Sequence, residues 1–212
     1  MIARRQILRS TASLAGVGLA GSILPATAWA AMRPTSAQSL GPFYPVTLPT
    51  DRDTDLTIIA GHGGQADGQI IDLAGRVLDG DGAPIAGARV EIWQANRHGR
   101  YVHPRDRSTA PLDPAFQGYG VATTDMDGRY VFRTIKPGAY PTGGNSMRPP
   151  HIHFAVTGPS QRLITQMYFP GEPLNDTDRL LGRAANPKSL MAAVTLAGGA
   201  LLARWDIVLA RG

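Results

Sequence analysis

From Gln69 to the C-terminus, the sequence is a succession of short apolar runs separated by turn residues at close spacing. Asp-Gly and Pro-Gly pairs mark several of the turns, at residues 79–80, 127–128 and 137–138. The 25 Gly and 17 Pro among 212 residues leave little room for long helices. The pattern predicts an all-β chain folded as an antiparallel β-sandwich with few short helices.

Six runs are predicted to be strands because they alternate between apolar and polar residues or are rich in β-branched and aromatic residues. Only residues 187–196 suggest a short helix. The predicted strands cover residues 70–78, 88–93, 129–134, 151–156, 163–169 and 203–209.

Residues 1–30 have the features of an export signal: Arg4 and Arg5 near the start, a weakly apolar stretch at 12–24, and Ala-Trp-Ala at 28–30. The paired arginines favour a signal peptide of the twin-arginine type, and an ordinary secretory signal is the alternative. We therefore expect export to the periplasm and cleavage after Ala30. The apolar stretch is too short to anchor the chain, so no stable membrane insertion is expected after cleavage.

The mature chain divides by composition into two parts. Residues 31–67 are rich in Pro, Thr, Gly and Asp and are predicted to form an extended N-terminal arm, whereas residues 68–212 carry the sandwich domain. Three of the 21 basic residues lie in the first thirty positions, where there is no acidic residue, so the remainder is nearly balanced in charge. Without a basic stripe, nucleic-acid binding is not expected.

The segment from Arg148 to Phe154 holds a His-x-His pair on a predicted strand. Side chains alternate along a strand, so His151 and His153 project from one face and can share a metal ion. A surface pair or a hydrogen-bonded core pair is the alternative. No Asp or Glu near the pair is expected on that face to complete a metal site, and the absence of cysteine excludes thiolate sites. The other histidines, predicted to be solvated in loops, are His62, His98 and His103.

Two tyrosines, Tyr101 and Tyr140, precede the histidine pair, and here the sequence resembles the intradiol ring-cleavage dioxygenases. The resemblance covers most of the expected mature chain and is closest to the iron-bearing subunit of the protocatechuate-cleaving members. It rests on GPFYP at 41–45, EIWQANRHGRY at 91–101, TIKPGAYP at 134–141, RPPHIHF at 148–154 and LITQMYF at 163–169.

The resemblance implies a non-haem Fe(III) centre with four protein ligands, which are Tyr101, Tyr140, His151 and His153. It also implies that Tyr140 is displaced and accepts a substrate proton, that Arg148 stabilises negative charge on the ring, and that Gln166 orients the site. The implied reaction is cleavage of a catechol-type ring by O2 to a cis,cis-muconate-type diacid. A phenolate suits a hard ferric ion, and metal binding removes the phenolic proton.

Several alternatives stay open at this stage. Small sandwich modules of the transthyretin-like kind share the strand and turn pattern and bind ligands without catalysis. A periplasmic zinc- or copper-binding protein is a third hypothesis. Thr142 stands two residues after Tyr140, where the protocatechuate-cleaving members carry Trp. The substituents of the substrate ring are therefore not fixed by the resemblance, and protocatechuate is the first expectation. A homo-oligomer and a hetero-oligomer with a second kind of subunit are both open expectations.

Overall fold

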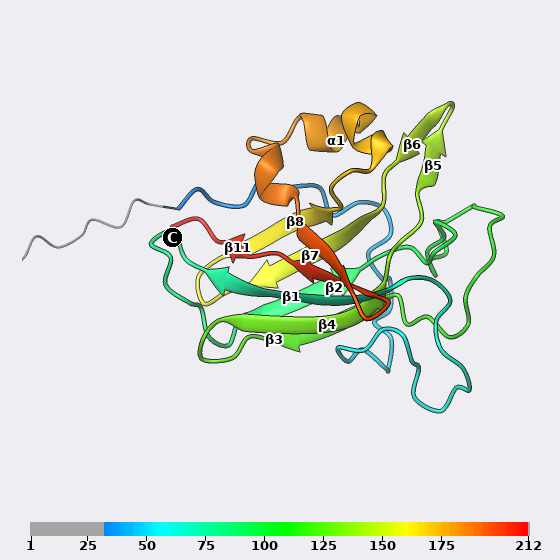
Figure 1. Ribbon diagram of the computed structural model, residues 1–212, viewed down its shortest axis with the longest axis horizontal. Coiled ribbons are helices and arrows are strands. Elements are labelled where there is room, and N and C mark those ends of the chain that lie inside the picture. Colours follow the sequence, from blue (N-terminus) through cyan, green and yellow to red (C-terminus); the bar gives the residue numbers. More distant parts are fainter. Residues whose placement is uncertain (1–31, 212) are drawn as a thin grey trace, which may run out of the picture.

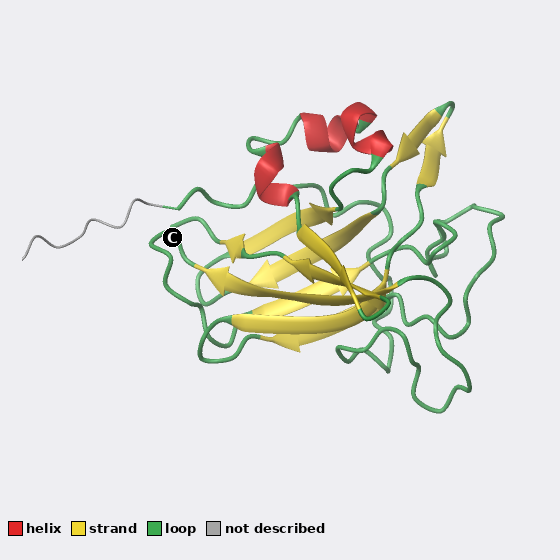
Figure 2. Cartoon of the chain, viewed as in Figure 1, coloured by secondary structure: helices red, strands yellow, loops and turns green. Residues whose placement is uncertain are grey.

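The computed structural model describes residues 32–211, and strands make up most of its regular structure (Figures 1 and 2). Two sheets pack face to face, and a two-stranded hairpin projects beyond them. The strands are β1 (Ile70–Leu78), β2 (Arg89–Trp93), β3 (Tyr119–Thr123), β4 (Arg129–Ile135), β5 (Tyr140–Gly143), β6 (Ser146–Arg148), β7 (His151–Thr157), β8 (Arg162–Tyr168), β9 (Ala193–Ala197), β10 (Ala200–Arg204) and β11 (Ile207–Val208).

The first sheet is built around β1, which pairs antiparallel with β4 and parallel with β10 and β11. Strand β9 pairs antiparallel with β10. The second sheet has the order β3-β2-β7-β8 and is antiparallel throughout. The predicted all-β sandwich is therefore confirmed, with two parallel pairings in the first sheet as an additional feature.

The core lies between the sheets and is formed by the inward-facing residues of both. Ile152, Phe154 and Val156 of β7 are fully buried there and pack with Leu73 and Phe132 of the opposite sheet. The other face of the second sheet carries a separate aromatic cluster, formed by Trp93, Ala95, Tyr101, Tyr119, Tyr140 and Ala155. Strand β7 thus has two different buried faces.

The arm from Met32 to Gln69 contains no strand of its own and runs along the second sheet before forming loops at one end of the sandwich (Figure 1). The helices are a single short turn of α1 (Arg179–Gly182) and two 3₁₀ turns, η1 (Pro173–Thr177) and η2 (Pro187–Leu190). None of these helices is long enough to cross a bilayer. The expected export signal at residues 1–30 lies outside the described residues.

Two predicted elements need correction. The expected helix at 187–196 is only the 3₁₀ turn η2, because Ala193 to Leu196 belong to β9 and pair with β10. The expected strand at 203–209 is interrupted at Trp205 and Asp206, where Trp205 turns its indole toward Phe154 and its backbone carbonyl accepts a hydrogen bond from Tyr130. The gap between β10 and β11 thus lies where the Trp205 side chain packs into the core.

Replacement of Phe154 by Ala tests the assignment of the inner face of β7. The ring is fully buried against Trp205 and Tyr130, so its loss should lower the free energy of unfolding by about 3–5 kcal/mol. Urea denaturation measures this change. The control is Val131→Ala on β4, whose side chain is 60% exposed and should change stability by about 0.5 kcal/mol or less. Equal losses in both variants would contradict the assignment.

Candidate active site

Strand β7 presents His151 and His153 on the face opposite the core. Both imidazoles are buried, with 1% exposure each, and their ring centroids lie 4.9 Å apart. The strand is paired on both sides, with His153 opposite Trp93 of β2 and Gln166 of β8. The indole of Trp93 stacks on His153 at 4.9 Å. The hydrogen bonds to the neighbouring strands and the stacking on Trp93 fix the position of the two imidazole rings relative to each other.

Tyr101 reaches this face from the loop that follows β2. The loop is organised by the buried Asn96, whose side-chain oxygen accepts from the backbone amides of His98 and Arg100. Gly99 lies in the left-handed region at φ 74°, and a Cβ there would sit 2.2 Å from the carbonyl oxygen of Ala139. The glycine therefore lets this loop touch the segment that leads into Tyr140.

Tyr140 begins β5 and pairs in register with Arg148, the last residue of β6. This hairpin was not predicted, yet it places the phenol and the guanidinium side by side. Arg148 is followed by two prolines and then by His151, so the hairpin and β7 are directly connected. The Tyr140 side chain is buried, and its ring lies 5.5 Å from the ring of Tyr101.

The structure brings together all four side chains that were expected to act as ligands. The hydroxyl of Tyr140 lies 3.3 Å from Nε2 of His151, and the ring of Tyr101 lies 6.3 Å from that of His153. Nδ1 of His151 donates to the carbonyl oxygen of Pro149 at 2.7 Å, which leaves Nε2 with its lone pair toward the cluster.

Unpaired buried atoms indicate that the cluster is suited to a cation. The hydroxyl of Tyr101 and Nδ1 of His153 are buried without a hydrogen-bond partner, which is costly unless another group binds them. Phenolate oxygen and imidazole nitrogen form a donor set that a hard, highly charged metal ion accepts. No group of three His, Asp or Glu side chains that could hold a metal occurs between residues 32 and 211.

Burial sets the protonation of the cluster. Desolvation, followed by the charge of Arg148, lowers the pKa of His151 to about 3, and desolvation also lowers the pKa of His153 well below its usual value. Both imidazoles are therefore neutral and able to bind a metal at neutral pH. Desolvation raises the pKa of Tyr101 and of Tyr140, so both phenols keep their protons until a cation displaces them.

Arg148 is held by three partners next to Tyr140. Its Nε donates to Asp178 at 2.6 Å, and its Nη2 donates to Gln166 at 2.7 Å and to the hydroxyl of Tyr168 at 2.8 Å. Asp178 also caps α1 by accepting from the amide of Leu181. A guanidinium fixed in this way keeps its charge at one place over the whole working range of pH.

Gln166 connects the site to the arm. Its side-chain oxygen accepts from Arg148 and Tyr168, and its side-chain nitrogen donates to the carbonyl oxygen of Ser39. Asp178, Tyr168 and the arm residues were not expected at the site. Tyr168 and Gln166 bond to arm residues more than a hundred positions away in the sequence. Asp178 is placed by the single turn of α1 that it caps. Local sequence patterns reveal neither kind of contact.

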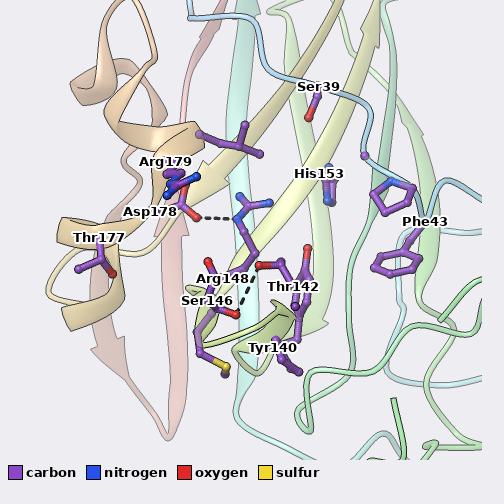
Figure 3. Close-up of a pocket in the computed structure, with 16 residues that line it drawn as sticks. Ser39, Phe43, Tyr140, Thr142, Ser146, Arg148, His153, Thr177, Asp178 and Arg179 are labelled. Atoms are coloured by element: carbon purple, nitrogen blue, oxygen red, sulfur yellow. Dashed lines mark hydrogen bonds and ion pairs between the residues drawn. The ribbon is translucent and has the colours of Figure 1, made fainter. Parts of the chain in front are cut away.

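A cavity of about 590 Å³ opens beside the cluster. Figure 3 shows Arg148 in its centre, with Asp178 on one wall and with His153 and Phe43 on the other. Thr142 lines the cavity, whereas His62, His98 and His103 do not. These three histidines lie in loops, as predicted, and only the ring of His103 approaches the site, at 5.7 Å from Phe43.

Comparison with known proteins identifies the family. A family model described as "Dioxygenase" matches residues 40–211. The protocatechuate 3,4-dioxygenase beta chain of Burkholderia cepacia is 51% identical over 142 residues, which are 65% of this chain and 57% of that protein. The hydroxyquinol 1,2-dioxygenase of Rhizobium sp. (strain MTP-10005) is 33% identical over 68% of this chain and 50% of its own length. The chain thus spans about half the length of these curated relatives.

Solved structures agree with this result. The dioxygenase domain of a dioxygenase carbohydrate-binding protein fusion from Streptomyces sp. SirexAA-E aligns with a TM-score of 0.66 and 31% identity, over 85% of this chain and 100% of that one. The catechol 1,2-dioxygenase of Pseudomonas arvilla C-1 aligns with a TM-score of 0.64 and 26% identity, over 83% and 62% of the two chains. The chain belongs to the intradiol ring-cleavage dioxygenase family.

Proposed function

We propose that this protein uses a non-haem ferric ion to cleave a catechol-type ring with O2 between its two hydroxylated carbons, yielding a cis,cis-muconate-type diacid. The observation that carries the proposal is the convergence of two phenols and two imidazoles beside an open cavity and a fixed guanidinium. Tyr101, Tyr140, His151 and His153 would hold the ion. When bound, it would act as a Lewis acid and as a template for the catechol.

The surrounding residues have separate roles in this proposal. Tyr140 lines the cavity and, once ionised, can accept a proton from a catechol hydroxyl at its phenolic oxygen. Arg148 would stabilise negative charge on the ring, and its contacts to Asp178 and Gln166 aim it without further reorganisation. Gln166 would act as an orienting residue because its side chain hydrogen-bonds to Arg148 and to none of the four proposed ligands.

Protocatechuate is the proposed first substrate. The cavity is lined by Arg148, Arg179 and the single carboxylate of Asp178, which is already paired with Arg148. Arg179 is exposed, and within residues 32–211 it makes no ion pair. A net positive cavity favours a catechol with a carboxylate. The name of the Burkholderia relative supports this substrate and, as a beta chain, supports assembly with a second kind of subunit.

The competing hypotheses are less consistent with the site. A binding module without catalysis would not need two phenols and two imidazoles buried together, with Tyr101 and His153 left partly unpaired. A dedicated zinc or copper site would be expected to use imidazole, thiolate or carboxylate ligands. The pairing of two phenols with two imidazoles favours a ferric ion.

Iron-loaded protein should be coloured by tyrosinate-to-iron charge transfer and should consume oxygen with catechols. Tyr101→Phe and His151→Ala each remove one donor, so both should lose the colour and at least about 100-fold in kcat, as expected when a transition-state interaction is lost. Oxygen-electrode assays on a panel of catechols, together with visible spectra, measure both effects.

The matched control is Tyr130→Phe, which also removes one buried tyrosine hydroxyl, but from the core, where it donates to the carbonyl oxygen of Trp205. Its colour and turnover should match those of the wild type. Colourless iron-loaded wild type without oxygen uptake would contradict the enzyme proposal. Activity of the purified single chain would contradict a requirement for a second subunit.

Arg179→Gln tests the proposed preference for an anionic ring. Removal of one exposed positive charge from the cavity wall should lower kcat/KM for protocatechuate relative to that for catechol by about two- to fivefold, and the difference should shrink in salt. Steady-state kinetics with both substrates give the ratio. Arg183→Gln, on an exposed residue outside the cavity, should leave it unchanged. An unchanged ratio in Arg179→Gln would contradict this preference.

Export is a further part of the proposal and rests on the sequence of residues 1–30 alone. Replacement of Arg4 and Arg5 by Lys should leave the precursor in the cytoplasm if the twin-arginine route is used, because that route reads the paired arginines. Cell fractionation and immunoblotting measure the distribution. Undiminished periplasmic protein in the double variant would indicate an ordinary secretory signal.

A further inference from the structure

The arm segment from Gln38 to Tyr44 forms one wall of the candidate site. Phe43 stacks on Tyr101 with ring centroids 4.6 Å apart, and its edge faces Tyr140 at 6.2 Å. A Cβ on Gly41 would lie 3.0 Å from Cε1 of His153, so the backbone there rests directly on that imidazole. The arm therefore touches three of the four proposed ligands.

Next to this contact lies a buried carboxylate to which the proposed reaction assigns no role. Glu91 of β2 is 5% exposed and lies on the same sheet face as His153, because it pairs with Ala155 while the neighbouring Trp93 pairs with His153. Glu91 is thus a carboxylate on this face, but among residues 32–211 it forms no three-residue metal-binding group with His151 and His153. The period-two alternation of residues 88–93 was a signal that could have located Glu91.

Glu91 is bound by two tyrosines and one arginine. Its Oε2 accepts from the hydroxyl of Tyr44 at 2.6 Å and from that of Tyr119 at 2.9 Å, and its Oε1 accepts from Nε of Arg89 at 2.9 Å. Arg89 also donates to the hydroxyl of Tyr119. We call Glu91, Tyr44, Tyr119 and Arg89 the arm clamp. Tyr44 belongs to the arm, and its bond to Glu91 attaches the arm to strands β2 and β3.

The arm clamp keeps a charge in a place where an isolated carboxylate would be unfavourable. Burial by itself would raise the pKa of Glu91, but the hydrogen bonds from Tyr44, Tyr119 and Arg89 outweigh this effect and lower it. Glu91 is therefore ionised at neutral pH, and hydrogen bonds to an ionised acceptor are short and strong. The bond from Tyr44 fixes the arm one residue away from Phe43.

We propose that Tyr44 and Glu91 are positioning residues, which hold Phe43 and Gly41 against Tyr101 and His153 and so fix the geometry of the site without touching substrate. Tyr44 and Glu91 do not line the cavity beside the cluster, so they act through neighbouring residues, namely the arm and Trp93, on which the ring of Tyr44 packs edge-on. The spectroscopic and kinetic parts of this inference rest on the proposed function, whereas the anchoring of the arm does not.

The test compares Tyr44→Phe with Tyr130→Phe. Each variant loses one buried or half-buried hydroxyl, but only the first loses a hydrogen bond between the arm and the sheet. Hydrogen exchange of metal-free protein should show amides 38–46 exchanging about tenfold faster in Tyr44→Phe alone. The Gln38 amide, which donates to the carbonyl oxygen of Ile164, reports on the arm directly.

Iron-loaded Tyr44→Phe should also show a shifted charge-transfer band and a kcat/KM for catechol about tenfold lower, because small displacements of reacting groups are costly. Glu91→Gln should produce the same shift, since it weakens the same bond from the other side. The double variant Tyr44→Phe/Glu91→Gln should then be little worse than either single variant.

Unchanged exchange in residues 38–46 of Tyr44→Phe would overturn the anchoring role. An unshifted band with fast exchange would overturn the positioning role, as would additive losses in the double variant. A wild-type protein that binds no iron and consumes no oxygen would contradict the proposed function, and the positioning role would fall with it.

Discussion

The alternation of side chains along β7 is the constraint on which the candidate site depends. Ile152 and Phe154 are fully buried in the core, which forces His151 and His153 onto the opposite face. A register slip of one residue would exchange the two sets, and the loss of core burial prevents it. Because β7 is hydrogen-bonded to β2 on one side and to β8 on the other, the backbone that carries the two imidazoles is held in place by the sheet. The remaining groups reach them from loops, the hairpin and the arm.

The same burial leaves polar atoms of the cluster without hydrogen-bond partners. Neutral imidazoles and protonated phenols face each other in a space where Tyr101 and His153 lack full hydrogen bonding. A bound cation would satisfy these groups and release the phenolic protons, so its affinity should increase with pH. The fixed guanidinium of Arg148 adds positive charge beside the cluster and favours anionic ligands in the cavity.

Local sequence patterns predicted the strands that matter most, because β1, β4, β7 and β8 have regular alternation or dense apolar runs. Strand alternation singled out His151 and His153, resemblance added Tyr101 and Tyr140, and the structure places the four together. The β5–β6 hairpin was missed because its seven strand residues lie among Gly and Pro. Asp178 and Tyr44 were missed because their roles arise from contacts with distant segments, which periodicity does not encode.

The central claim is that two phenols and two imidazoles bind one ferric ion. A crystal structure of the iron-loaded protein, with the metal located by anomalous scattering at the iron edge, tests it most directly. The account predicts a single iron within bonding distance of the hydroxyl oxygens of Tyr101 and Tyr140 and of one ring nitrogen each of His151 and His153. Iron bound elsewhere, or bound without the two tyrosines, would contradict it.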